Sequence, residues 1–138
     1  VMDASKPDKS LIAACDLVIA DVPCSGLGVI RKKPDIRYKE LSEIEKLPLT
    51  QLNILNGLAP CVKPGGVLLY STCTILEQEN GGVIDRFLQE HKEFSTEGFV
   101  LPSPIGETTS GRLSLYPHIN HTDGFYVCKL RKHDENRH

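Results

Sequence analysis

Several features that would place the protein in a special class are missing from its sequence. No apolar run approaches the roughly 20 residues of a membrane helix, and no basic-then-apolar signal segment opens the chain. The five cysteines form no Cys-x-x-Cys pair, which argues against a zinc knuckle or ribbon. There is no internal repeat and no low-complexity tract. We therefore expect a cytoplasmic protein with reduced thiols, no membrane contact and no bound metal.

The composition that remains is typical of one modest globular domain. The chain has 138 residues, of which 40% are hydrophobic and 25% charged, with a net charge of −2. The charge is uneven, because residues 31–39 (RKKPDIRYK) carry five basic side chains and one acidic one. Such a cluster can bind the phosphates of a nucleic acid, although a solvated loop is the simpler interpretation of an isolated cluster.

Two apolar runs predict strands that are buried on both faces of a sheet. Residues 16–22 (DLVIADV) and 67–72 (VLLYST) are nearly continuous in apolar side chains, as strands of parallel sheets are. The segment KPGG at 63–66 is predicted to be a turn. Three later segments are expected to be a short strand, a loop and a final strand, at 94–100, 101–111 and 123–132.

Two helices are expected between these strands. Residues 48–62 place an apolar stripe on one helical face, formed by Leu52, Leu55, Leu58, Ala59 and Val62. Pro48 suits the first position of this helix, and Gly57 with Pro60 predicts a kink or an early stop. In the second helix, Thr74 and Glu77 resemble a capping box, and Glu77 and Glu79 suit a first helical turn. Its apolar face is expected to contain Val83, Ile84, Phe87, Leu88 and His91. This order of elements predicts an α/β fold.

Glycines do not complete a dinucleotide-binding loop. Gly26 and Gly28 follow the first predicted strand, but Arg31 stands where the third glycine of that motif would be.

Two cysteines fall just past the ends of the predicted strands. Cys24 follows the first strand and Cys73 follows the second. Ligands of open α/β sheets bind at the carboxyl ends of strands, and neighbouring strands lie about 4.8 Å apart. The two thiols should therefore share a crevice with Asp21 at its mouth. A helix beginning directly after Cys73 would favour its thiolate, the nucleophilic form. The other cysteines are expected to be small buried apolar groups, namely Cys15, Cys61 and Cys128.

The segments around both cysteines carry a resemblance to a known family. DVPCSGLGVIRKKPDIRY at 21–38 and GGVLLYSTCTILEQEN at 65–80 resemble the Nol/Nop/Sun RNA (cytosine-5) methyltransferases, and among them the bacterial Sun/Fmu-type 16S ribosomal RNA enzymes. The resemblance implies a Rossmann-like fold, of which this chain would form the carboxyl-terminal half of the sheet with an antiparallel final strand. It also implies that S-adenosylmethionine is used to form 5-methylcytosine in RNA, most simply ribosomal RNA.

The resemblance also implies roles for individual residues. Cys73 would attack carbon 6 of cytosine, and Cys24 would assist removal of the carbon-5 proton and release of the product. Asp21 would contact the pyrimidine edge and the cofactor, and Pro23 would shape the wall between the cytosine and cofactor sites. Asp3 resembles an acid that contacts the adenosine end of the cofactor. RNA phosphates would be bound by Arg31, Lys32, Lys33 and Arg37.

The sequence departs from the family pattern in several places. Gly81 stands where the family commonly has a glutamate, and neither the glycine-rich cofactor loop nor the acidic strand end for the ribose is present. We therefore expect residues 1–132 to be the carboxyl-terminal part of a catalytic domain and 133–138 a frayed tail. Alone, this part is expected to retain S-adenosylmethionine poorly, to be inactive, and to be able to form a homodimer through uncovered sheet edges or helix faces.

Three alternatives remain open at this point. A DNA cytosine-5 methyltransferase would use Cys24 as its nucleophile and would leave the segment STCT without a role. A non-enzymatic RNA-binding or interaction fragment would bind no cofactor. A thiol redox pair would join Cys24 and Cys73, without the Cys-x-x-Cys spacing usual for such pairs.

Overall fold

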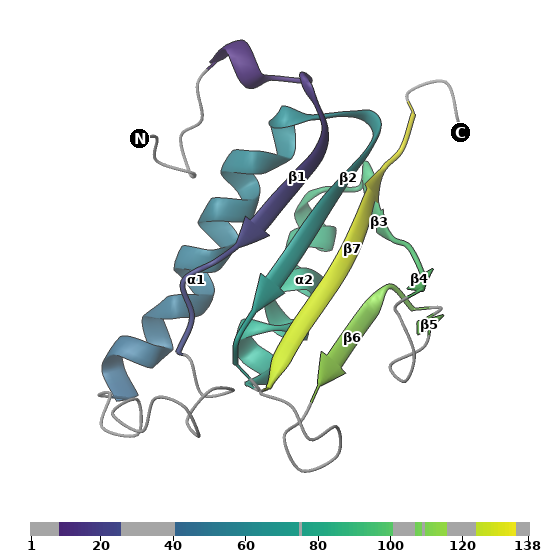
Figure 1. Cartoon of the computed structure of the whole chain (residues 1–138). Coiled ribbons are helices and arrows are strands. Elements are labelled where there is room, and N and C mark those ends of the chain that lie inside the picture. Colours follow the sequence, from purple (N-terminus) through teal and green to yellow (C-terminus); the bar gives the residue numbers. More distant parts are fainter. Residues whose placement is uncertain are drawn as a thin grey trace.

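The fold is a mixed β-sheet with two helices packed on one of its faces (Figure 1). The computed structural model describes residues 9–25, 41–74, 76–100, 107–108, 110–115 and 124–134. The strands are β1 (Cys15–Asp21), β2 (Val62–Thr72), β3 (Phe94–Thr96), β4 (Phe99–Val100), β5 (Glu107–Thr108), β6 (Arg112–Leu115) and β7 (Phe125–Lys132). The helices are α1 (Leu41–Leu58) and α2 (Gly81–Glu90), with short 3-10 turns at Lys9–Leu11, Ala59–Cys61 and Glu77–Glu79.

The topology brings the two predicted apolar strands side by side. The main sheet has the order β1-β2-β7-β3, β6 also pairs with β7, and β4 pairs with β5 separately. β1 and β2 are parallel, with Asp21 opposite Ser71 at their carboxyl ends. β7 is antiparallel to β2. The predicted neighbouring strands and the antiparallel final strand are therefore confirmed, and both cysteine-bearing loops leave the sheet at the same edge.

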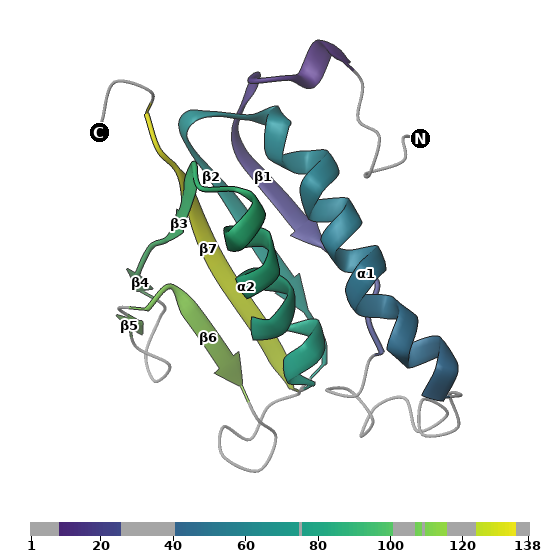
Figure 2. The same cartoon turned by 180° about the vertical axis from the view of Figure 1, so that it is seen from behind.

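The core lies between the helices and the sheet face that they cover (Figure 2). Leu52 and Leu55 of α1 are buried there, as are Ile84 and Phe87 of α2. The sheet contributes side chains from alternate positions, because successive residues of a strand point to opposite faces. These are Ala20, Leu68, Tyr70, Tyr126, Cys128 and Leu130. The predicted apolar faces are confirmed for Leu52 and Leu55 of α1 and for Val83, Ile84 and Phe87 of α2. Ala59, Val62 and His91, which were expected on these faces, lie outside the two helices.

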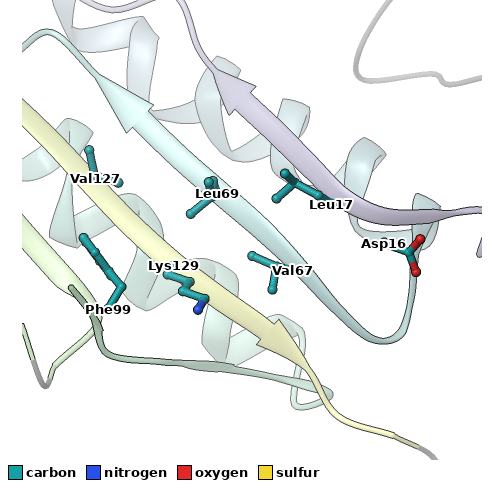
Figure 3. Close-up of a pocket in the computed structure, with 7 residues that line it drawn as sticks. All are labelled: Asp16, Leu17, Val67, Leu69, Phe99, Val127 and Lys129. Atoms are coloured by element: carbon teal, nitrogen blue, oxygen red, sulfur yellow. The ribbon is translucent and has the colours of Figure 1, made fainter. Parts of the chain in front are cut away.

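The opposite sheet face carries apolar side chains with little covering them. Leu17 and Ile19 of β1 are 52% and 64% exposed. Figure 3 shows a shallow pocket on this face, with the helices behind the sheet. Its lining comes from three neighbouring strands and β4, and consists of Asp16, Leu17, Val67, Leu69, Phe99, Val127 and Lys129.

The start of the first helix was predicted wrongly. α1 begins at Leu41, and Pro48 lies inside it rather than at its first position. The segment before the proline (LSEIEKL) consists mainly of good helix formers, which extend the helix although proline removes one backbone donor. The early stop was correct, since α1 ends at Leu58 and a 3-10 turn follows.

The predicted turn at 63–66 is also wrong, because this segment belongs to β2. The register of β1 and β2 shifts between Cys15 and Leu17, whose partners are Val62 and Val67. The additional residues form an irregularity in the strand, where Gly65 has φ +83°. Such bulges accommodate extra residues without ending the strand.

The second half of the chain contains more short strands than expected. The predicted strand near 94–100 is divided into β3 and β4, and part of the predicted loop, at 107–108, forms β5. β6 was not predicted at all. The final strand is confirmed as β7. Within the described parts of the chain, no helix combines the length and apolarity needed to cross a bilayer.

Candidate active site

The thiols of Cys24 and Cys73 meet at the edge where β1 and β2 end. Their Sγ atoms are 3.1 Å apart, and the backbone N–H of Cys73 donates to Cys24 Sγ at 3.4 Å. Both cysteines are half-buried free thiols. The prediction that these two thiols, 49 positions apart, lie together at the carboxyl ends of neighbouring strands is therefore confirmed.

Strand pairing continues past β1 and fixes the beginning of the Cys24 loop. The backbone N–H of Val22 donates to the carbonyl of Ser71 at 3.3 Å. The hydroxyl of Ser71 donates to the Asp21 carboxylate at 3.2 Å. Pro23 follows, and because proline has no N–H the ladder ends there. Asp21 is thereby held at the end of β1 near Cys73, with its side chain exposed.

The expected activation of Cys73 by a helix start is wrong. Burial, the hydrogen bond with Cys24 and the nearby Cys24 and Asp21 charges raise the pKa of the Cys73 thiol from 9.0 to about 11. Helix α2 begins only at Gly81, so its amino terminus does not follow Cys73 directly. In the free protein Cys73 is therefore a protonated thiol at neutral pH, and its proton must leave before the sulfur can act as a nucleophile.

The predicted capping box at Thr74 and Glu77 is not formed. The Thr74 hydroxyl accepts a hydrogen bond from the Leu76 N–H at 3.2 Å and contacts the Glu79 carboxylate at 2.9 Å. Glu79, which was expected to favour a first helical turn, is completely buried. The competing interaction is tertiary, because Thr74 is drawn toward the loop that carries Cys24 rather than toward α2.

A buried polar network joins the residues that follow the two thiols and was missed by sequence reasoning. The carboxylate of Glu79 accepts hydrogen bonds from the backbone N–H and the hydroxyl of Ser25, at 2.8 and 2.7 Å, and from the amide of Gln51 at 3.1 Å. The Tyr70 hydroxyl donates to the backbone carbonyl of Glu79 at 2.6 Å. Burial of a glutamate in a short polar segment leaves no periodic signal, so only the position of Glu79 next to STCT could have suggested its role.

Of the remaining predicted residues, some lie in the described parts of the chain and others do not. Pro23 is described, and its carbonyl accepts a hydrogen bond from Gln51. Asp3 and the predicted phosphate-binding residues lie outside the described residues; the latter are Arg31, Lys32, Lys33 and Arg37. Cys61 and Cys128 are buried as predicted, whereas Cys15 is only half-buried.

Comparison with known proteins identifies the family of this chain. Residues 1–131 match the family model described as 16S rRNA methyltransferase RsmB/F. The chain belongs to this family. RsmB/F methyltransferases use S-adenosylmethionine as the methyl donor, and the STCT segment with its Cys24 partner now lies within a family whose members act on RNA.

Two curated relatives of this RsmB/F chain are similar in sequence but considerably longer. It is 44% identical over 131 residues to the probable ribosomal RNA small subunit methyltransferase B of Synechocystis, covering 92% of this chain and 29% of the relative. The corresponding protein of Bacillus subtilis is 45% identical over 122 residues, covering 85% and 27%. The chain thus spans less than a third of the length of these curated relatives.

A solved structure shares the fold. The crystal structure of NSun6 from Pyrococcus horikoshii with SFG, an S-adenosylmethionine analogue, matches with a TM-score of 0.70 and 30% identity, covering 95% of this chain and 33% of that one. The mixed sheet and its helices are therefore part of a Rossmann-like S-adenosylmethionine-dependent methyltransferase fold, as predicted.

Proposed function

We propose that this chain carries the catalytic cysteines of an enzyme that methylates carbon 5 of cytosine in RNA, using S-adenosylmethionine. The observation that supports this most strongly is the 3.1 Å separation of Cys24 Sγ and Cys73 Sγ at the carboxyl ends of two parallel strands. One thiol can add to a pyrimidine while the other remains within reach of the same ring. A DNA-type mechanism with Cys24 as its single nucleophile would leave Cys73 unused at this position.

Cys73 is the proposed nucleophile. Its sulfur forms a bond to carbon 6 of cytosine, and the ring electrons move to carbon 5, which becomes able to attack an electrophilic methyl group. The Cys73 proton has to leave first, and it passes to solvent, since the Cys73 thiol is only half-buried. After methylation the thiolate of Cys24 accepts the carbon-5 proton. The electrons of that C–H bond restore the double bond between carbons 5 and 6, and the carbon–sulfur bond breaks to return Cys73 as a thiolate.

Asp21 and Pro23 fit the sites proposed for cytosine and cofactor. The Asp21 carboxylate is exposed at the strand end and uses Oδ1 to accept from Ser71, so it can accept further hydrogen bonds from a ring N–H or an amino group. Pro23 is held in place by Gln51 and supplies a rigid wall. S-adenosylmethionine supplies the methyl group when it is bound. Asp3 remains a proposed contact for its adenosine end.

The proposed substrate is ribosomal RNA with the target cytosine exposed from its stack, because a base within a helix cannot present carbon 6 to a thiol. The support is the family to which the chain belongs. Phosphate contacts are assigned to the basic cluster, Arg31, Lys32, Lys33 and Arg37. Replacing all four by glutamine should flatten the salt dependence of RNA binding, and an unchanged slope would contradict that assignment.

The two cysteine roles can be separated in a full-length protein that carries these residues. With unmodified RNA and S-adenosylmethionine, Cys24→Ala should accumulate a covalent protein–RNA adduct, because release fails after addition. Cys73→Ala should form no adduct and no 5-methylcytosine. Adduct formation by Cys73→Ala would overturn the proposed roles, and methylation of DNA but not RNA would favour the DNA-type alternative.

For the chain in isolation, we propose self-association through the uncovered sheet face. The exposed Leu17 and Ile19 lie there beside further apolar side chains of β2 and β7. In this state the chain is expected to bind S-adenosylmethionine poorly and to lack activity. Light scattering should detect a dimer of residues 1–138 that is weakened by Ile19→Lys; a monomer at all concentrations would contradict this.

A further inference from the structure

The buried carboxylate of Glu79 joins the loops that carry the two thiols. Oε1 accepts from the Ser25 backbone N–H and from Gln51, and Oε2 contacts the hydroxyls of Ser25 and Thr74 at 2.7 and 2.9 Å. These hydroxyls are also 2.8 Å from each other. Of the ion pairs among the described residues, none includes Glu79. Its charge is accommodated by hydrogen-bond donors, which is how a buried anion avoids the cost of lost hydration.

The partners of Glu79 are the residues that directly follow the cysteines. Ser25 follows Cys24, and Thr74 follows Cys73. One carboxylate therefore holds both loops at the first residue beyond each thiol, although these loops are 49 positions apart in the chain. A shift of Glu79 would change the separation of the two sulfurs more directly than it would change the core beneath them.

Asn80 completes the attachment of the Cys73 loop. Its Oδ1 accepts from the Thr72 hydroxyl at 2.6 Å, and its Nδ2 donates to the Thr74 carbonyl at 3.0 Å. The amide thus bridges the two residues that flank Cys73. Because Glu79 and Asn80 are adjacent, one short segment fixes Cys73 from both sides and ties it to the Cys24 loop.

We propose that Glu79 is a positioning residue of the active site, which sets the distance between Cys24 and Cys73 so that both sulfurs can act on one cytosine. The inference rests on the proposed function, but the geometric part concerns only the two thiols. Glu79 itself touches neither sulfur in any described contact, and acts through Ser25 and Thr74.

The substitution Glu79→Gln tests this role most sharply. Glutamine has the same shape but only one acceptor oxygen, so an amide nitrogen in place of Oε2 would donate to the Ser25 and Thr74 hydroxyls. One of these hydroxyls could then donate to the other, but the second would lose the acceptor that the carboxylate now provides. The loops should then separate. Glu79→Asp keeps the charge and both oxygens but shortens the side chain, so it should give an intermediate effect. Glu77→Gln is the matched control, because Glu77 lies on the same 3-10 turn with an exposed side chain.

Phenylarsine oxide can report thiol proximity independently of methylation. Its arsenic forms two As–S bonds with a pair of adjacent thiols, while its oxygen leaves as water with the two thiol protons. The background should carry Cys15→Ala, because Cys15 pairs with Val62 beside Cys61 and could form a second site. Cys24→Ala shows the affinity expected when only one thiol of the active pair remains. Circular dichroism at the same temperature shows that each variant is folded.

In the full-length protein, Glu79→Gln should weaken arsenical binding by about tenfold, the usual consequence of losing a charge-assisted buried contact. Glu77→Gln should bind like the wild type. At saturating 5-fluorocytosine RNA, the single-turnover rate of adduct formation should fall by a similar factor, while the RNA concentration for half-maximal rate stays unchanged. If Glu79 had a purely structural role, the substitution would lower the melting temperature without lowering the rate of adduct formation selectively.

Folded Glu79→Gln with wild-type arsenical affinity and adduct rate would overturn the proposal. If Glu79→Gln does not fold, Glu79→Asp decides in its place: an affinity between those of the wild type and Cys24→Ala supports the proposal, and wild-type affinity contradicts it. If the wild type binds the arsenical but forms no RNA adduct, the proposed function is wrong while the comparison of Glu79 variants still decides whether this residue positions the thiols.

Discussion

The side-chain amide of Gln51 donates a hydrogen bond to the backbone carbonyl of Pro23 at 3.0 Å. Gln51 is completely buried in α1, and Pro23 precedes Cys24. The same Nε2 atom also donates to Glu79. A single amide therefore connects the long helix to the loop of one thiol and to the carboxylate that holds both loops.

Replacing Gln51 by leucine should destabilise the protein although leucine is apolar and similar in size. The change removes this donor from the partly buried Pro23 carbonyl and from an oxygen of the buried Glu79 carboxylate, which should cost about 1–3 kcal/mol in the free energy of unfolding. Urea denaturation of the full-length protein measures the change. Gln89→Leu is the control, because Gln89 is an exposed helical residue. Equal stability of the two variants would show that the Gln51 bonds contribute nothing.

The reactivity of Cys73 toward iodoacetamide should depend on Cys24. The pKa of Cys73 is raised to about 11 by burial and by its interactions with Cys24 and Asp21. Only the thiolate is alkylated, so the rate should rise with pH toward a midpoint near 11. Cys24→Ala removes the hydrogen bond and the neighbouring thiol charge, so the midpoint should move to lower pH. Mass spectrometry of the Cys73 peptide follows the reaction, and an unchanged midpoint would exclude the proposed coupling.

In the irregular part of β2, substitution of Gly66 should destabilise the protein more than substitution of the adjacent Gly65. A Cβ at Gly66 would lie 2.9 Å from the Lys63 carbonyl oxygen and 3.0 Å from that of Asp16. Since backbone must move to relieve this, Gly66→Ala should destabilise by about 1–3 kcal/mol. Gly65 has φ +83° with open space around it, and Gly65→Asn should cost less than about 1 kcal/mol, because asparagine tolerates that conformation. The reverse order in thermal melts would contradict the placement of these residues.

Elements with a regular apolar pattern were predictable from the sequence. β1, β7 and the buried face of α2 follow from continuous or periodic apolar residues, and the parallel pairing of β1 with β2 follows from the helix between them. Prediction failed for segments that lack a periodic pattern of apolar residues. Pro48 inside α1 and KPGG inside β2 are local signals that tertiary packing overrides, and β6 is only four residues long.

The two cysteines of the candidate site could be predicted from the sequence, but the residue that holds their loops in place could not. Cys24 and Cys73 were found because strand ends and a family resemblance mark them. Glu79 was interpreted as a helix-start residue, because nothing in a sequence distinguishes a buried carboxylate from an exposed one. The same limit applies to the pKa of Cys73, which depends on burial and on Cys24 rather than on its neighbours in the chain.

The central claim, that Cys73 and not Cys24 forms the bond to cytosine, can be tested by locating the bond itself. A full-length protein with these residues should be trapped on 5-fluorocytosine RNA with S-adenosylmethionine, then digested with ribonuclease and trypsin. Cys73 and Cys24 fall in different tryptic peptides, residues 47–86 and 10–31. Fragmentation spectra should place the methylated fluorocytosine on Cys73, separately from Cys61 in the same peptide. A modified Cys24 with an unmodified Cys73 would contradict the account.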